Sequence, residues 1–219
     1  MRKFFEIGGI AAAAILIAFG ITSIVVGING RSTVRTSLGQ EQIVGSPDMT
    51  PSGIAAEAKK AGLPGTIDLP TVPVAGKAID TGARAQAFAS YMRIHALEAS
   101  GGVTYSQMGR FTARPGSPAS FTDGHGATND PKYALVDSIT KQPVDNGARN
   151  LWVTETALTT ALNTSYMAEQ VSLFGIAMGV ALLLAGIGFG ILTLGGALRT
   201  EGSRGFLRGS KPAAAAAKA

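Results

Sequence analysis

The sequence lacks cysteine altogether, and charged residues make up only 15% of its 219 residues. Without cysteine the chain has no disulfide, no thiolate nucleophile and no cysteine-ligated metal. The charged fraction lies well below the roughly 25% that is usual in soluble domains. Histidine occurs only at His95 and His125, and the sequence contains no Gly-x-Ser-x-Gly elbow. We therefore predict no catalytic residues and no cofactor, and favour a non-enzymatic membrane protein.

The net charge of +5 resides at the two ends of the chain. Residues 29–170 hold 12 basic and 12 acidic side chains, whereas the ends together hold 7 basic and 2 acidic ones. A nucleic-acid-binding surface would concentrate basic residues on a folded domain, so nucleic acid is not an expected partner. Basic flanks beside apolar runs follow the positive-inside rule. The pattern predicts cytoplasmic termini (1–6 and 199–219), an extracytoplasmic segment at 29–170, and the lipid bilayer as a partner.

Two uncharged apolar runs, residues 7–28 and 171–198, are long enough to cross a bilayer. A hydrocarbon core needs about 20 apolar residues in a helix. A cleaved signal peptide is the alternative for the first run, but its apolar core is typically only 7–15 residues long. We therefore expect an uncleaved anchor at 7–28. Neither run contains an ionisable residue, which argues against an ion or proton path built by this chain alone.

Residues 151–170 lead into the second apolar run without proline or glycine. Leu151, Leu158, Leu162 and Tyr166 recur there at helical spacing among polar residues. The pattern predicts one long helix, with an amphipathic part at 151–170 and a membrane part at 171–198. Asn150 is the expected N-cap. The predicted fold class is a mainly α membrane protein, whose two transmembrane helices flank a small helix-rich extracytoplasmic domain.

Small residues at four-residue spacing are a feature of both apolar runs. Such residues let helix backbones approach closely in lipid. One interpretation is that the two spans pack on each other. The other is that a second stripe of small residues recruits a partner or another copy of the chain. The pairs are Gly175 and Gly179, Ala181 and Ala185, Gly186 and Gly190, Gly9 and Ala13, Ala14 and Ala18, and Ser23 and Gly27.

The outer segment at 29–150 is long enough for one small domain. Thr50-Pro51 is typical of a helix start, and Gly62 of its end. The strongest helix is expected at 82–99, where apolar residues lie on more than one side. This helix should pack on 151–170. We expect a small hairpin at 133–144 and a disordered basic tail at 199–219, while the order of 31–48 and 112–131 stays undetermined.

The candidate metal ligands in the sequence are His95, Glu98 and His125. Glu98 follows His95 by three residues on a helix, so both lie on roughly one face. Two histidines and one carboxylate suit non-haem iron. However, their spacing matches no strong local metal motif. We therefore predict no metal site and keep these three residues as the only candidates.

Three stretches resemble a group of actinobacterial membrane proteins of unknown function. They are IVGSPDMTP (43–51), YMRIHALEASGGVTYSQMGR (91–110) and ARNLWVTETALTTALNTSYMAEQ (148–170). Some members of that group carry an automatic label, aromatic ring-opening dioxygenase. The resemblance covers the chain up to about residue 199, and implies an actinobacterial cell-membrane protein with the same two-span layout. Such an enzyme needs an iron site in a soluble, substrate-sized pocket, whereas this chain offers two unpaired histidines and a small neutral domain. The label is therefore not carried over as the function.

Three hypotheses follow from the sequence. The first is a non-enzymatic accessory protein that binds other membrane or envelope proteins, or itself. The second is a membrane-anchored, metal-dependent oxygenase that uses His95, Glu98 and His125. The third is an accessory subunit of a transporter or channel, in which another chain supplies the polar path.

Overall fold

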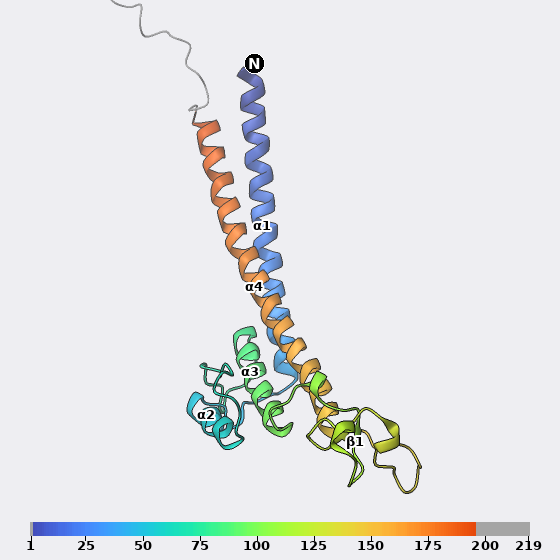
Figure 1. Ribbon diagram of the computed structural model, residues 1–219. Coiled ribbons are helices and arrows are strands. Elements are labelled where there is room, and N and C mark those ends of the chain that lie inside the picture. Colours follow the sequence, from blue (N-terminus) through green and yellow to red (C-terminus); the bar gives the residue numbers. More distant parts are fainter. Residues whose placement is uncertain (1, 196–219) are drawn as a thin grey trace, which may run out of the picture. The chain divides into compact units, whose positions relative to one another are not determined.

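The computed structural model describes the backbone of residues 2–195 and the side chains of residues 7–195 (Figure 1). The predicted basic tail at 199–219 and the side chains of the predicted cytoplasmic N-terminus lie outside the described residues. The chain forms two compact units. One comprises the described residues up to Val26 and from Gly175 onward, and the other comprises Gly27–Phe174.

Helix α1 comprises Arg2–Gln40 and helix α4 comprises Gly147–Leu194. Both are long and apolar enough to cross a membrane, and the prediction of a mainly helical protein with two such helices is confirmed. Helix α1 continues beyond the apolar run at 7–28 to Gln40. No proline lies between Arg2 and Gln40, so nothing removes a backbone donor or forces the helix to end earlier.

Helix α4 contains the amphipathic stretch and, without a break, the second apolar run as far as Leu194, as expected. Residues 196–198 of that run lie outside the described residues. The expectation of Asn150 as its N-cap is wrong. The helix begins at Gly147, and Asn146 caps it: its Oδ1 accepts from the amide of Ala148 at 3.1 Å. The carbonyl of Asn146 accepts from the amide of Asn150 at 3.2 Å. The dipeptide Asn146-Gly147 thus forms the start of the helix.

In the first unit, α1 and α4 approach each other at glycine. A Cβ added to Gly179 would lie 2.7 Å from the carbonyl oxygen of Gly20, and one added to Gly186 would lie 2.9 Å from the amide nitrogen of Ile17. The Ser23 hydroxyl donates to the carbonyl of Gly175 at 2.8 Å. Close backbones and interhelical hydrogen bonds are how helices associate in lipid, where no hydrophobic effect drives them together.

In the second unit, helices α2 (Pro51–Lys60) and α3 (Gly82–Ala99) start as their sequences predict. The Thr50 hydroxyl accepts from the amide of Gly53 at 3.0 Å, and the Thr81 hydroxyl from the amide of Arg84 at 3.3 Å. Each cap satisfies one of the free amides that a helix N-terminus leaves.

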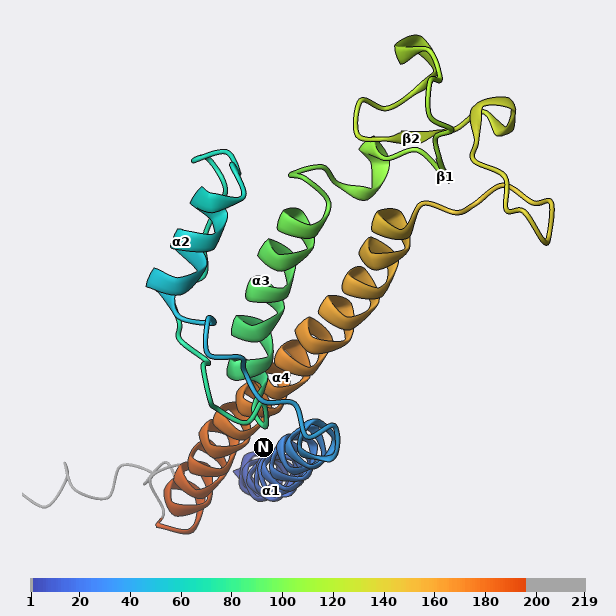
Figure 2. The ribbon, with the colours of Figure 1, turned by 90° about the horizontal axis from the view of Figure 1, so that it is seen from below.

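Helix α3 lies between α2 and the adjacent part of α4 (Figure 2). Its residues Tyr91 and Ile94 are almost fully buried, and they belong to one hydrophobic core together with Ile54 of α2 and Trp152 and Leu162 of α4. The prediction that α3 packs on residues 151–170 is confirmed. Burial on both sides explains why its apolar residues are not confined to one stripe.

Residues 100–146 contain little regular structure. Strands β1 (Phe111–Thr112) and β2 (Ala127–Thr128) pair in antiparallel orientation, with Phe111 opposite Thr128. Three short 3-10 helices lie at Tyr105–Gln107, Ala119–Phe121 and Pro131–Tyr133. The expected hairpin is present as an antiparallel bridge between Val136 and Pro143.

Candidate metal centre

Three side chains from separate segments of the second unit converge at the junction of α2 and α3. Asp48 lies in the turn before α2, where the amide of Met49 donates to the Ser46 carbonyl at 3.1 Å. Met49 is 3% exposed and so anchors this turn in the core. Glu57 lies on α2 one turn after the fully buried Ile54, which directs that side of α2 toward α3. His95 lies on α3, one turn after the fully buried Tyr91.

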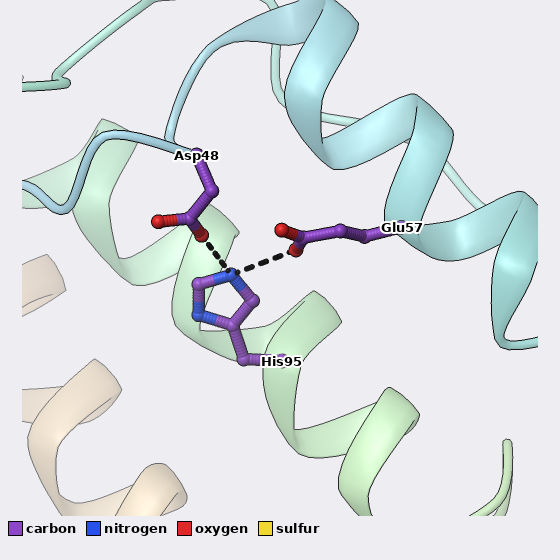
Figure 3. Close-up of side chains that lie close together, drawn as sticks. All are labelled: Asp48, Glu57 and His95. Atoms are coloured by element: carbon purple, nitrogen blue, oxygen red, sulfur yellow. Dashed lines mark ion pairs between the residues drawn. The ribbon is translucent and has the colours of Figure 1, made fainter.

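The imidazole of His95 is the centre of this cluster (Figure 3). Its Nε2 atom lies 2.8 Å from Oδ2 of Asp48 and 3.4 Å from Oε2 of Glu57. One potential ligand atom from each of the three residues lies within 4.8 Å of the others. The three side chains are between about a quarter and a third exposed, so the cluster is accessible to small ions.

The electrostatic environment keeps Asp48 ionised. A hydrogen bond with the side chain of Ser46 lowers the pKa of Asp48 most; burial opposes this, and the nearby His95 lowers it further. The Nε2 atom of His95 is itself shielded from solvent, and a carboxylate oxygen of each acidic residue lies close to it. Two carboxylates therefore approach one nitrogen that has at most a single N–H to donate.

The set of residues considered from sequence is only partly assembled. His95 is in the cluster, but Glu98 is exposed on α3, and His125 is exposed in the loop before β2. Among the described residues, Asp48, Glu57 and His95 form the only group of three such side chains close enough to share an ion. Sequence reasoning missed Asp48 and Glu57. A usable signal existed for Glu57, because it follows the apolar Ile54 by three residues and therefore lies beside it on the helix.

A cavity of about 410 Å³ adjoins the other side of His95, between α3 and α4. Its walls are mostly apolar, with Met92 and Ala96 on α3 and Leu158 on α4. Glu155 also lines it and is 5% exposed. Its carboxylate accepts from the Thr159 hydroxyl at 2.8 Å. His95 therefore lies between a polar cluster and an apolar cavity.

The residues predicted to mediate helix packing fall on different faces of the apolar helices. Gly179, Gly186 and Ala13 are buried, Gly9, Gly175 and Gly190 are partly buried, and Ala181 and Ala185 are exposed. Gly20 also lies at the contact, although it belongs to none of the predicted pairs. The relevant signal was a seven-residue spacing: Ala13 to Gly20 on α1, and Gly179 to Gly186 on α4. This spacing keeps one face of each helix toward its partner.

No protein-family model, no curated protein and no solved structure matches this chain.

Proposed function

We propose that the chain is an integral membrane protein of the cell envelope that acts as a non-enzymatic accessory or interaction protein. In this proposal both termini are cytoplasmic, helices cross the membrane at 7–28 and 171–198, and residues 29–170 form an extracytoplasmic domain. Partners are other membrane or envelope proteins, or further copies of the chain.

The length and composition of α1 and α4 support the membrane location. The exposed side chains of their apolar parts are large and hydrophobic, including Phe19, Val26, Phe174, Leu184 and Ile191, each at least 63% exposed. A water-soluble protein rarely exposes so much contiguous apolar surface. In a bilayer, the apolar lipid tails cover such a surface and keep it out of water. The positive charge at the two ends supports cytoplasmic termini.

The observation that carries the interaction proposal is the difference between two faces of α4. Gly179 and Gly186 are buried against α1. Ala181 and Ala185 are exposed, and at 100° per residue they lie on the opposite side of the helix from Gly179. The face formed by Ala181 and Ala185 therefore remains available for close approach by another transmembrane helix.

The test is affinity recovery of the tagged chain from its native membranes in mild detergent, followed by mass spectrometry. A companion protein recovered in reproducible stoichiometry supports the proposal. Its identity would indicate the cellular process in which the chain acts. A polytopic companion would specify an accessory subunit of a transporter or channel. Recovery of a monomeric chain without any companion would contradict the proposal.

The double variant Ala181→Leu, Ala185→Leu places two larger side chains on the exposed face without touching the α1 contact. We expect it to reduce recovery of the companion by at least about tenfold, which corresponds to about 1.4 kcal/mol. The control is Leu184→Ile, at a position that is 63% exposed. This control keeps the side-chain volume and should leave recovery unchanged.

A further inference from the structure

We propose that Asp48, Glu57 and His95 bind one divalent transition-metal ion of the Zn²⁺ class. This site is independent of the interaction proposed above, since it lies in the second unit and uses none of the residues of the apolar helices. The distances between the three side chains, their charges and the hydrogen-bonding capacity of one nitrogen atom all support a shared ion.

An ion pair alone does not account for the arrangement. A neutral imidazole has one N–H, and a protonated one has a single N–H at Nε2. Two carboxylate oxygens nevertheless lie 2.8 Å and 3.4 Å from that one atom, and its single N–H cannot be donated fully to both of them. A cation placed between the three groups would instead take one lone pair from each of them.

The separations fit a shared ion. Oxygen and imidazole nitrogen ligands lie at about 2.0–2.2 Å from Zn²⁺. Two ligands at that distance from one tetrahedral ion are about 3.3–3.6 Å apart, and the observed distance from His95 Nε2 to Glu57 Oε2 is 3.4 Å. The shorter distance to Asp48, 2.8 Å, requires only a small outward movement of a side chain that is 30% exposed.

The charges fit a divalent ion. Asp48 and Glu57 contribute two negative charges when ionised, and one oxygen of each lies within reach of the same ion. A neutral imidazole completes the set, so that one divalent cation neutralises the site. An imidazole nitrogen favours Zn²⁺ and neighbouring transition metals over Ca²⁺ and Mg²⁺, which prefer oxygen.

The bound ion would join the turn before α2, helix α2 itself and helix α3. Three protein ligands leave at least one coordination position open for water or for a group from another molecule. The partial exposure of all three side chains leaves that position accessible to solvent.

The experiment uses the full chain purified in detergent with an affinity tag free of histidine, after removal of metals with EDTA. Zn²⁺ is added, excess ion is removed by gel filtration, and bound metal is counted by elemental analysis. Isothermal titration gives the affinity, and Ca²⁺ is titrated in parallel. We expect about one Zn²⁺ per chain, weaker binding of Ca²⁺ and a higher unfolding temperature with Zn²⁺.

His95→Ala and Asp48→Asn test the assignment of ligands. Each should weaken Zn²⁺ binding by at least about tenfold and abolish the rise in unfolding temperature. Asp48→Asn keeps the shape of the side chain, and far-UV circular dichroism of the metal-free variants checks that the fold is retained. The matched controls are His125→Ala and Glu98→Gln, which change the other histidine and an exposed carboxylate, and both should bind as the parent does.

Substoichiometric Zn²⁺ in the parent protein would overturn the proposal. Equal binding by His95→Ala and the parent, with loss in His125→Ala, would also overturn it. Binding of Ca²⁺ as strong as that of Zn²⁺ would exclude the imidazole as a ligand and so contradict the assigned site.

Discussion

Glu169 on α4 forms ion pairs with α1 and a hydrogen bond with the start of α3 in the second unit. Its side chain is only 6% exposed, and its Oε1 atom lies 3.0 Å from Nε of Arg31 and 3.2 Å from Nε of Arg35, both on α1. Its Oε2 atom accepts from the amide of Gly82, at the start of α3, at 2.6 Å. One carboxylate thus contacts α1 and α3 from its own position on α4, outside the proposed span at 171–198.

Replacing this carboxylate should destabilise the second unit. Glu169→Gln removes the negative charge and leaves two guanidinium groups without their partner. We expect a loss of about 2 kcal/mol, below the 3–5 kcal/mol of fully buried pairs because both arginines are partly exposed to solvent. Thermal unfolding in detergent measures the loss. Glu98→Gln, on an exposed carboxylate, is the control and should unfold as the parent does.

The same carboxylate predicts a dependence of stability on pH. Burial raises the pKa of Glu169, but the hydrogen bonds from Arg31, Gly82 and Arg35 outweigh it and hold the pKa below its ordinary value of 4.5. A carboxyl whose pKa is lower in the folded state stabilises the protein fully above the unfolded value, and this contribution is lost as the pH falls through the folded value. The unfolding temperature should therefore fall below about pH 4.5, and less steeply in Glu169→Gln. Parallel pH profiles of the two proteins would contradict this assignment.

Gly82 occupies a position that admits no side chain. A Cβ added there would lie 2.8 Å from the Cα atom of Tyr166 and 2.9 Å from Oε2 of Glu169. Because the first of these neighbours is backbone, the helices must move apart to accommodate it.

Gly82→Ala should therefore lower the stability of the second unit by about 1–3 kcal/mol, the usual range for overpacking. The control is Gly39→Ala in α1, where a Cβ would have nothing within 4 Å. There the higher helix propensity of alanine should make stability equal or slightly greater. Denaturant or thermal unfolding distinguishes the two, and equal effects would show that close packing at Gly82 does not matter.

At the scale of elements, helix starts could be predicted from sequence because their signals are local. Thr50 caps the helix that Thr50-Pro51 predicts, and the helix expected at 82–99 begins at Gly82, where Thr81 caps it. The start of α4 is misassigned from sequence because Asn146 and Asn150 both offer a capping side chain, and Asn146 is the one that accepts from the first turn. The contacts of Glu169 and the cluster around His95 join residues far apart in sequence. No local pattern encodes such pairings, so only the folded chain reveals them.

Asp123 orders the loop between β1 and β2 through hydrogen bonds to backbone amides, a role that was not predicted from the sequence. The carboxylate of Asp123 accepts from the amides of Gly109 and His125 at 2.8 Å and of Ala127 at 2.9 Å. Burial raises the pKa of Asp123, but these amides, together with nearby His125, outweigh it and lower the pKa. The carboxylate thus gives three backbone amides, two of them outside the strands, a hydrogen-bond acceptor.

Asp123→Ala should remove the acceptor of those three amide hydrogen bonds and so loosen the loop. Hydrogen exchange should become faster at Gly109, His125 and Ala127, by about tenfold for each 1.4 kcal/mol of local stability lost. Helices α2 and α3 should keep their protection. Asp68→Ala, at an exposed carboxylate, is the control. Unchanged exchange at the three amides would mean that other contacts order the loop.

At the scale of the whole molecule, the absence of cysteine allows the proposed topology to be tested directly. Single cysteines introduced as Ser52→Cys and Ser117→Cys lie in the proposed extracytoplasmic domain, at residues that are exposed or partly exposed. Ser203→Cys lies in the proposed cytoplasmic tail. We expect a membrane-impermeant maleimide added to intact cells to label the first two variants but not the third.

After the cells are opened, all three variants should react, which serves as the control for accessibility of each thiol. The parent chain has no thiol and should stay unlabelled throughout, which measures the background. The prediction follows from the charge balance, because translocating a neutral segment of 12 basic and 12 acidic residues meets less resistance than translocating the basic ends. Labelling of Ser203→Cys alone in intact cells would invert the topology and place the domain of residues 29–170 in the cytoplasm.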